Sequence, residues 1–104
     1  MTKTAVITGC STGLGLSCAL LFSQNGYTVF ATVRKLEDSK NLTEALQKEK
    51  VDENLVKFIV MDVASDESVT LGFKSIHEQT KKVDVLICNA GFFFDTIFNI
   101  EFLK

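Results

Sequence analysis

Proline is absent from this 104-residue chain, and basic residues are in slight deficit, with 11 Lys and Arg against 13 Asp and Glu. Because neither proline nor a low-complexity stretch marks a linker, we expect one domain with one modest core. The formal net charge of −2 provides no basic excess to attract phosphate backbones or anionic membranes. The composition therefore argues against a nucleic-acid partner.

Cysteine is scarce and apolar runs are short. The 3 cysteines form no Cys-x-x-Cys pair and stand among apolar or small neighbours, as buried reduced thiols do. No run approaches the roughly 18 apolar residues of a membrane helix, and glycines interrupt the N-terminal stretch where a signal peptide would be continuous. No metal-ligand spacing is present. We therefore expect a cytoplasmic protein without a membrane span or a metal site.

Short β-branched runs alternate with longer amphipathic segments, which predicts a parallel sheet covered by helices. Strands are expected over residues 4–8, 27–33, 55–61 and 83–88. The first run is apolar without alternation, as in a strand that is buried on both faces. The predicted order is βαβαβαβ, and the predicted fold class is α/β.

Three helices are expected between these strands. Asn25-Gly26 ends the first, and Asp38-Ser39 and Ser65-Asp66 offer caps for the second and third. The apolar residues expected to face the sheet recur at helical spacing. They are Leu14, Cys18, Leu21 and Phe22 in the first helix, Leu42, Ala45 and Leu46 in the second, and Val69, Phe73 and Ile76 in the third.

A glycine-rich turn, TGCSTGLG at residues 8–15, joins the first strand to the first helix. A dinucleotide diphosphate must approach the backbone at the positive end of a helix, where side chains would obstruct it. Gly9 permits the tight turn, Gly13 leaves room for phosphates, and Gly15 lets the helix pack against the strand. The spacing differs from G-x-G-x-x-G, and Leu14 stands where a P-loop requires lysine. The alternative is a plain connector, but its position after a buried strand favours nucleotide binding.

Three ordered motifs resemble the short-chain dehydrogenase/reductase family: Thr8-Gly-x-x-x-Gly-x-Gly15, Asp62-Val63 and Asn89-Ala90-Gly91. The strings ITGCSTGLG, FATVR and VDVLICNAG look most like its hydroxysteroid and retinol dehydrogenase branch. The resemblance implies a Rossmann-type parallel sheet with helices on both faces, truncated here after about four strands. It further implies an NAD(P)-binding half-Rossmann domain over residues 1–91 and a hydrophobic C-terminal tail of the same domain over residues 92–104.

The resemblance also implies a set of cofactor-binding residues. In the set, Asp62 would contact the adenine ring with the Val63 backbone beside it, and Asn89 and Gly91 would line the ribose side. The full set is Gly9, Ser11, Thr12, Gly13, Leu14, Gly15, Arg34, Asp62, Val63, Asn89, Ala90 and Gly91. Two alternatives stay open, because a strand-end aspartate also caps the following turn and Asn-Ala-Gly is also a plain turn.

Arg34 indicates the type of cofactor. It stands at the end of the second expected strand, where the adenosine ribose would lie. An acidic residue there would bond the 2′-hydroxyl of NAD, whereas a guanidinium can clamp the 2′-phosphate of NADP. Val33 carries no carboxylate to repel that phosphate, and Lys35 adds a positive charge. A solvated basic pair opening a loop is the alternative, and we expect NADP over NAD.

The family transfers hydride with a Tyr-x-x-x-Lys pair, which this sequence lacks. Its single tyrosine, Tyr27, is followed four residues later by Ala31, so no catalytic residue is assigned; His77 is expected to flank a helix. We expect the NADP-binding portion of an oxidoreductase acting between NADP(H) and an alcohol or carbonyl, inactive as this chain. An apolar substrate would be bound only by a full-length parent.

The fourth expected strand would form an exposed apolar edge, followed by a phenylalanine-rich tail. This tail either shields the open face or mediates self-association, and we expect association in solution. The alternative function is a noncatalytic nucleotide-sensing or protein-interaction module built on the same loop. A receiver-like or flavodoxin-like domain is disfavoured, because the first strand ends in Thr8-Gly9 rather than in an acidic cluster.

Overall fold

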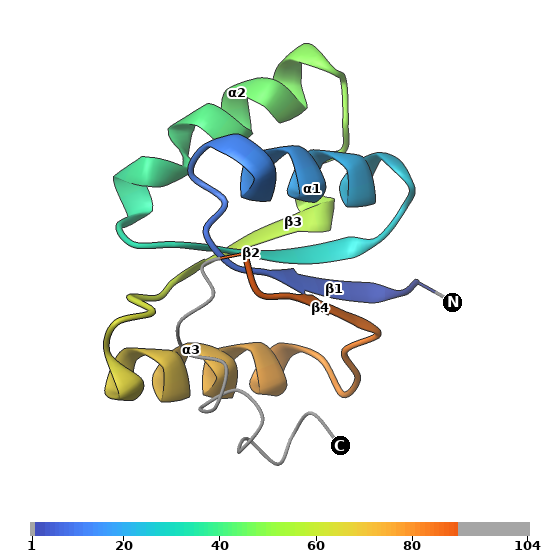
Figure 1. Ribbon diagram of the computed structural model, residues 1–104. Coiled ribbons are helices and arrows are strands. Elements are labelled where there is room, and N and C mark those ends of the chain that lie inside the picture. Colours follow the sequence, from blue (N-terminus) through green and yellow to red (C-terminus); the bar gives the residue numbers. More distant parts are fainter. Residues whose placement is uncertain (1, 90–104) are drawn as a thin grey trace.

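Figure 1 shows the computed structural model, which describes residues 2–89. Its strands and α-helices alternate: β1 (Thr4–Ile7), α1 (Gly13–Gln24), β2 (Thr28–Val33), α2 (Lys40–Lys48), β3 (Val56–Val60), α3 (Asp66–Gln79) and β4 (Val85–Ile87). Two short 3₁₀ helices, η1 (Leu36–Ser39) and η2 (Glu53–Leu55), precede α2 and β3. The predicted order βαβαβαβ is confirmed.

The four strands form one parallel sheet in the order β3-β2-β1-β4. The chain moves outward from β1 through β2 and β3, then crosses back to place β4 on the other side of β1. Helices α1 and α2 cover one face of the sheet and α3 covers the other (Figure 1). The Rossmann-type arrangement is therefore confirmed, and the strand order reverses between β1 and β4, where open α/β sheets place their ligands.

Each face of the sheet has its own apolar core, because successive strand residues point to opposite faces. On β2, Val29 and Ala31 pack in the core shared with α1 and α2, whereas Phe30 packs in the core shared with α3. Leu42 and Leu46 of α2 are buried, as predicted, while Ala45 is half-buried. The predicted inner face of α3 is confirmed in full, since all its members are buried: Val69, Phe73 and Ile76.

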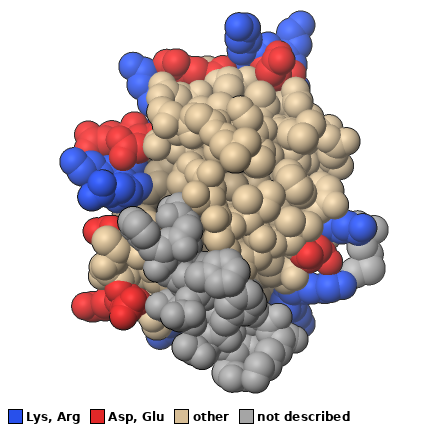
Figure 2. Space-filling model, viewed as in Figure 1, with Lys and Arg blue, Asp and Glu red and all other residues tan. Residues whose placement is uncertain are grey.

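The inner face of α1 differs in part from the prediction, since Cys18 and Phe22 are half-buried against the core but the other two predicted members are not. Its buried residues are Gly15, Ala19 and Ser23, whereas Leu14 and Leu21 are 71% and 57% exposed. The sequence of α1 has no charged residue and is apolar on all sides, so periodicity could not identify the face that touches the sheet. Small residues take that face because α1 lies close to the backbone before it. Figure 2 accordingly shows an uncharged surface at the centre of this view, with charges at its periphery.

The ends of the helices follow the predicted signals in part. Gly26 follows α1 with φ +85°, a left-handed conformation that glycine adopts cheaply. The hydroxyl of Ser65 accepts a hydrogen bond from the Ser68 N–H at 3.2 Å, which caps α3. Ser39 precedes α2 without a side-chain cap bond, because η1 already directs the chain into that helix.

The tail over residues 92–104 and the positions Ala90 and Gly91 lie outside the described residues. Strand β4 forms one edge of the described sheet, and its three residues are each half-buried. Association through this edge stays a prediction. Within residues 2–89, each helix is too short or too polar to cross a membrane.

Candidate functional site

The turn between β1 and α1 is built on two glycines in the left-handed region. Gly9 has φ +69° and Gly13 has φ +60°, values that strain any residue with a Cβ atom. Thr12 is the N-cap of α1 but makes no side-chain cap bond, and the first turn holds no acidic residue. The first-turn amides therefore have no capping side chain, and with the helix dipole they form a place for an anion.

Gly13 and Gly15 have different surroundings. A Cβ atom added at Gly15 would overlap the Gly9 carbonyl oxygen and lie 2.9 Å from the Asn89 Nδ2 atom. A Cβ atom added at Gly13 would meet nothing within 4 Å. Gly15 therefore serves internal packing, and Gly13 keeps the outer surface of the turn bare.

A hollow of about 130 Å³ lies beside this turn, and residues from three parts of the chain line it. It is lined by Gly9, Ser11, Thr32, Val33, Arg34, Met61 and Val63. The glycine turn, the end of β2 and the end of β3 thus meet at one place. Arg34 is exposed and is the one charged residue among those lining residues, so the hollow is suited to an anion.

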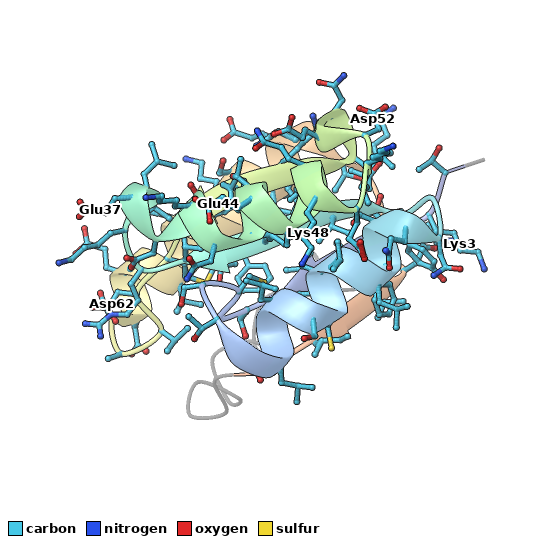
Figure 3. The ribbon with its side chains drawn as sticks, turned by 90° about the horizontal axis from the view of Figure 1, so that it is seen from above. Lys3, Glu37, Glu44, Lys48, Asp52 and Asp62 are labelled. Atoms are coloured by element: carbon cyan, nitrogen blue, oxygen red, sulfur yellow. The ribbon has the colours of Figure 1, made fainter. Side chains whose placement is uncertain are left out.

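Asp62 lies next to the hollow without lining it. Its Oδ1 atom accepts a hydrogen bond from the Ala64 N–H at 3.0 Å, and its own N–H donates to the Ser68 hydroxyl at 2.8 Å. The alternative of a turn-capping aspartate therefore describes its contacts. Figure 3 places Asp62 at the same end of the molecule as Glu37 and opposite Lys3, which precedes β1.

Asn89 ties the end of β4 to the glycine turn. Its Nδ2 atom donates to the Gly9 carbonyl oxygen at 3.1 Å, and its N–H donates to the Thr8 hydroxyl at 3.1 Å. The residue thus braces the central strand. Its neighbours in the motif, Ala90 and Gly91, lie outside the described residues.

Two further residues contact the turn in ways that were not predicted from the sequence. Thr32 accepts from the Gly9 N–H through its hydroxyl at 3.2 Å and from the Cys10 N–H through its carbonyl at 2.9 Å. Asn41 of α2 donates through Nδ2 to the Ser11 carbonyl at 3.3 Å. A polar residue near the end of a mostly apolar strand was the available signal for Thr32, and Asn41 gave none.

The site offers binding groups rather than a proton-transfer pair. Burial raises the pKa of the Cys10 thiol to about 12, and its Sγ atom donates to the Ile7 carbonyl at 3.1 Å, so the thiol is unsuited to attack a ligand. Tyr27 precedes β2 at the opposite end of the sheet, with its ring 4.9 Å from that of Phe22. The described residues hold no group of three or more His, Cys, Asp or Glu that could bind a metal ion.

Known proteins are similar to this sequence over most of its length. An oxidoreductase named BOA17 from Botryotinia fuckeliana is 41% identical over 92 residues, which cover 88% of this chain and 32% of that protein. Human 17-beta-hydroxysteroid dehydrogenase type 1 is 35% identical over 95 residues, which cover 88% of this chain and 28% of that protein. The chain therefore spans about a third or less of the length of these relatives.

Solved structures share the fold. Menthone neomenthol reductase from Mentha piperita superposes with a TM-score of 0.78 at 29% identity, over 88% of this chain and 32% of that one. A variant of actinorhodin polyketide ketoreductase, solved with NADPH, gives a TM-score of 0.73 at 26% identity, over 85% of this chain and 33% of that one. The family model described as short chain dehydrogenase matches residues 3–102. The chain belongs to the short-chain dehydrogenase family.

Proposed function

We propose that this chain is the NADP-binding portion of an oxidoreductase that transfers hydride between NADP(H) and an alcohol or carbonyl. One observation carries the proposal: the glycine turn before α1 and the exposed guanidinium of Arg34 belong to the same hollow. The ketoreductase solved with NADPH has the same fold. NADP supplies the hydride acceptor, and NADPH the hydride donor, in such a reaction.

The phosphate-binding part of the site is the start of α1. Its first-turn amides, including that of Leu14, would hold the diphosphate, because they point along the positive end of the helix dipole. The bare surface at Gly13 lets the phosphates approach the backbone. The hydroxyls of Ser11, which lines the hollow, and of Thr12, the N-cap, would add hydrogen-bond donors.

The adenosine part of the site follows β2 and β3. Arg34 would clamp the 2′-phosphate of NADP through paired N–H donors, and Lys35 would add a second positive charge. Val63 lines the same hollow and would lie beside the adenine, with the Asp62 carboxylate next to it. Because the lining residues named above include no carboxylate, the hollow favours the phosphate of NADP over the bare 2′-hydroxyl of NAD.

The remaining part of the site follows β4. Asn89 would line the ribose side together with Ala90 and Gly91, while it keeps its bonds to Thr8 and Gly9. The sequence holds no Tyr-x-x-x-Lys pair, which the family uses to move the proton that accompanies hydride. We therefore propose that this chain alone binds the cofactor without turnover.

A binding comparison with matched variants tests the proposal. Titration of the chain with NADPH and with NADH, followed by nicotinamide fluorescence, gives both dissociation constants. Arg34→Ala should weaken NADPH binding about tenfold, because charge-assisted hydrogen bonds to a phosphate are lost. It should leave NADH binding unchanged, since NADH lacks that phosphate.

The control is Lys57→Ala, which removes an exposed charge from the edge strand β3. It should leave both constants unchanged, because it alters the net charge equally but far along the strand from the hollow. If Arg34→Ala and Lys57→Ala lost the same NADPH affinity, the loss would come from the change in net charge and not from a contact of Arg34. Absence of binding by the unaltered chain would contradict the proposed function.

A further inference from the structure

The glycine turn must keep one shape for the first-turn amides of α1 to face a ligand. Two left-handed glycines give its backbone unusual freedom, so other contacts must hold it. Three elements do so from different sides. Asn89 bonds Gly9 from the end of β4, Asn41 bonds Ser11 from α2, and Thr32 bonds Gly9 and Cys10 from β2.

Thr32 is the most deeply placed of these contacts. It is 1% exposed, and its two oxygens accept hydrogen bonds from two consecutive amides of the turn: the hydroxyl from Gly9 at 3.2 Å and the carbonyl from Cys10 at 2.9 Å. Its side chain is short and β-branched, so few rotamers compete with the bonded one. The hydroxyl is therefore a stiff acceptor that fixes the Gly9 N–H inside the fold.

The position of Thr32 also relates the turn to Arg34. Arg34 follows the end of β2, two residues after Thr32, and both residues line the hollow together with Gly9 and Ser11. We propose that Thr32 is a positioning residue for the dinucleotide: its hydroxyl holds the Gly9 turn so that the first-turn amides of α1 meet the diphosphate. This inference rests on the proposed function and adds to it a residue that acts through the turn.

The inference predicts a pattern of affinity that differs from that of Arg34. The diphosphate is common to NADPH and NADH, so loss of the Thr32 hydroxyl should weaken both dinucleotides by the same factor. Loss of the Arg34 guanidinium should weaken NADPH alone. A comparison of NADPH with NADH therefore distinguishes the role of Thr32 from that of Arg34.

The experiment uses three variants on β2 and both dinucleotides. Thr32→Val keeps the shape of the side chain but leaves the half-buried Gly9 N–H without its acceptor, so both affinities should fall about fivefold. Thr32→Ser keeps the hydroxyl and should restore both to within about twofold. Thr28→Val, at the opposite end of the same strand, is the matched control and should change neither affinity.

Amide hydrogen exchange of Gly9, followed by NMR without ligand, gives a second readout. Exchange should quicken in Thr32→Val and stay slow in Thr32→Ser and Thr28→Val. If Thr32→Val does not fold, Thr32→Cys replaces it, because a thiol is a weak acceptor. Thr32→Cys should then show weaker binding of both dinucleotides and faster Gly9 exchange than Thr32→Ser and Thr28→Val.

The outcomes separate this inference from the proposed function. Unchanged affinities in Thr32→Val, or a serine variant that fails to restore them, would overturn the positioning role while cofactor binding stands. A loss confined to NADPH would also overturn it, since the role requires equal losses. If the unaltered chain binds neither dinucleotide, the proposed function fails and this inference fails with it.

Discussion

The side-chain amide of Asn89 donates to the carbonyl oxygen of Gly9 at 3.1 Å, across 80 residues of sequence. The N–H of Asn89 donates to the Thr8 hydroxyl as well. The last described residue after β4 therefore holds the first residues after β1, at the point where the strand order reverses. Docking of β4 and the shape of the glycine turn are thus linked in one set of contacts.

Asn89→Ala should lower the free energy of unfolding by about 1 kcal/mol, the usual contribution of one hydrogen bond. The backbone N–H bond to Thr8 survives in this variant, so the fold should be retained. Urea denaturation followed by circular dichroism measures the change. Asn54→Ala, at an exposed position of η2, is the control and should change stability less; equal losses in both variants would contradict the linking role.

The two glycines at the start of α1 should respond differently to alanine. In Gly15→Ala the new Cβ atom overlaps the Gly9 carbonyl oxygen, and because backbone cannot move aside cheaply the cost should be about 3 kcal/mol. Gly13→Ala meets open space and should cost about 1 kcal/mol, from its left-handed φ alone.

Nucleotide binding should depend on Gly13 more strongly than stability does. Gly13→Ala places a methyl group on the bare surface where phosphates would approach, so NADPH affinity should fall about tenfold although most of the stability remains. Thermal melts and fluorescence titrations of the same samples measure both properties. Full affinity in Gly13→Ala would mean that phosphates do not approach the turn there.

The polar residues of α3 identify its inner face from the sequence, whereas α1 offers no such signal. Val69, Phe73 and Ile76 face the sheet as predicted because charged and polar residues fill the other side of α3. The same reasoning was wrong for Leu14 and Leu21, because α1 is apolar all round and the need for close packing at Gly15 selects the face instead.

Some residues of the candidate site could be identified from the sequence and others could not. The sequence identified three glycines of the turn, because the backbone conformation or the packing at these positions requires glycine: Gly9, Gly13 and Gly15. The contacts of Thr32 and Asn41 could not be predicted from the sequence, since a hydrogen bond between distant elements depends on how those elements pack. The sequence left two roles open for Asp62, and its observed contacts are those of a turn cap.

Asp84 should make stability depend on pH at the amino end of the sheet. The Thr4 N–H, which donates to its Oδ2 atom at 2.8 Å, lowers the pKa of the Asp84 carboxyl, and Lys82, 3.3 Å away, adds to the effect. A carboxyl whose pKa is lower in the folded state stabilises the fold above its unfolded pKa of about 3.8 and loses that contribution as the pH falls.

Asp84→Asn should therefore be less stable than the unaltered chain near pH 7 and closer to it near pH 3, below the unfolded pKa of about 3.8, where part of the contribution of the carboxylate is lost. Urea midpoints at the two pH values measure the difference. Glu53→Gln, an exposed position in η2, serves as the control. A stability deficit that is the same size at both pH values would show that the charge of Asp84 does not matter.

Cysteine labelling should report on the glycine turn. Burial raises the pKa of Cys10 to about 12, so near pH 8 its thiolate is scarce and its sulfur is inaccessible. Cys18 and Cys88 are half-buried, and burial raises the pKa of Cys88 as well. Iodoacetamide followed by peptide mass spectrometry should therefore label Cys18 first, Cys88 next and Cys10 last.

Labelling of Cys10 requires the turn to open, because its thiol hydrogen bonds the Ile7 carbonyl within the fold. Conditions that stabilise the folded chain should slow this labelling in proportion to the population that opens. Saturating NADPH should do so if it binds the turn, whereas Cys18, which is half-buried further along α1, should be labelled at an unchanged rate. Cys10 labelling as fast as that of Cys18 would show that the turn is open in solution.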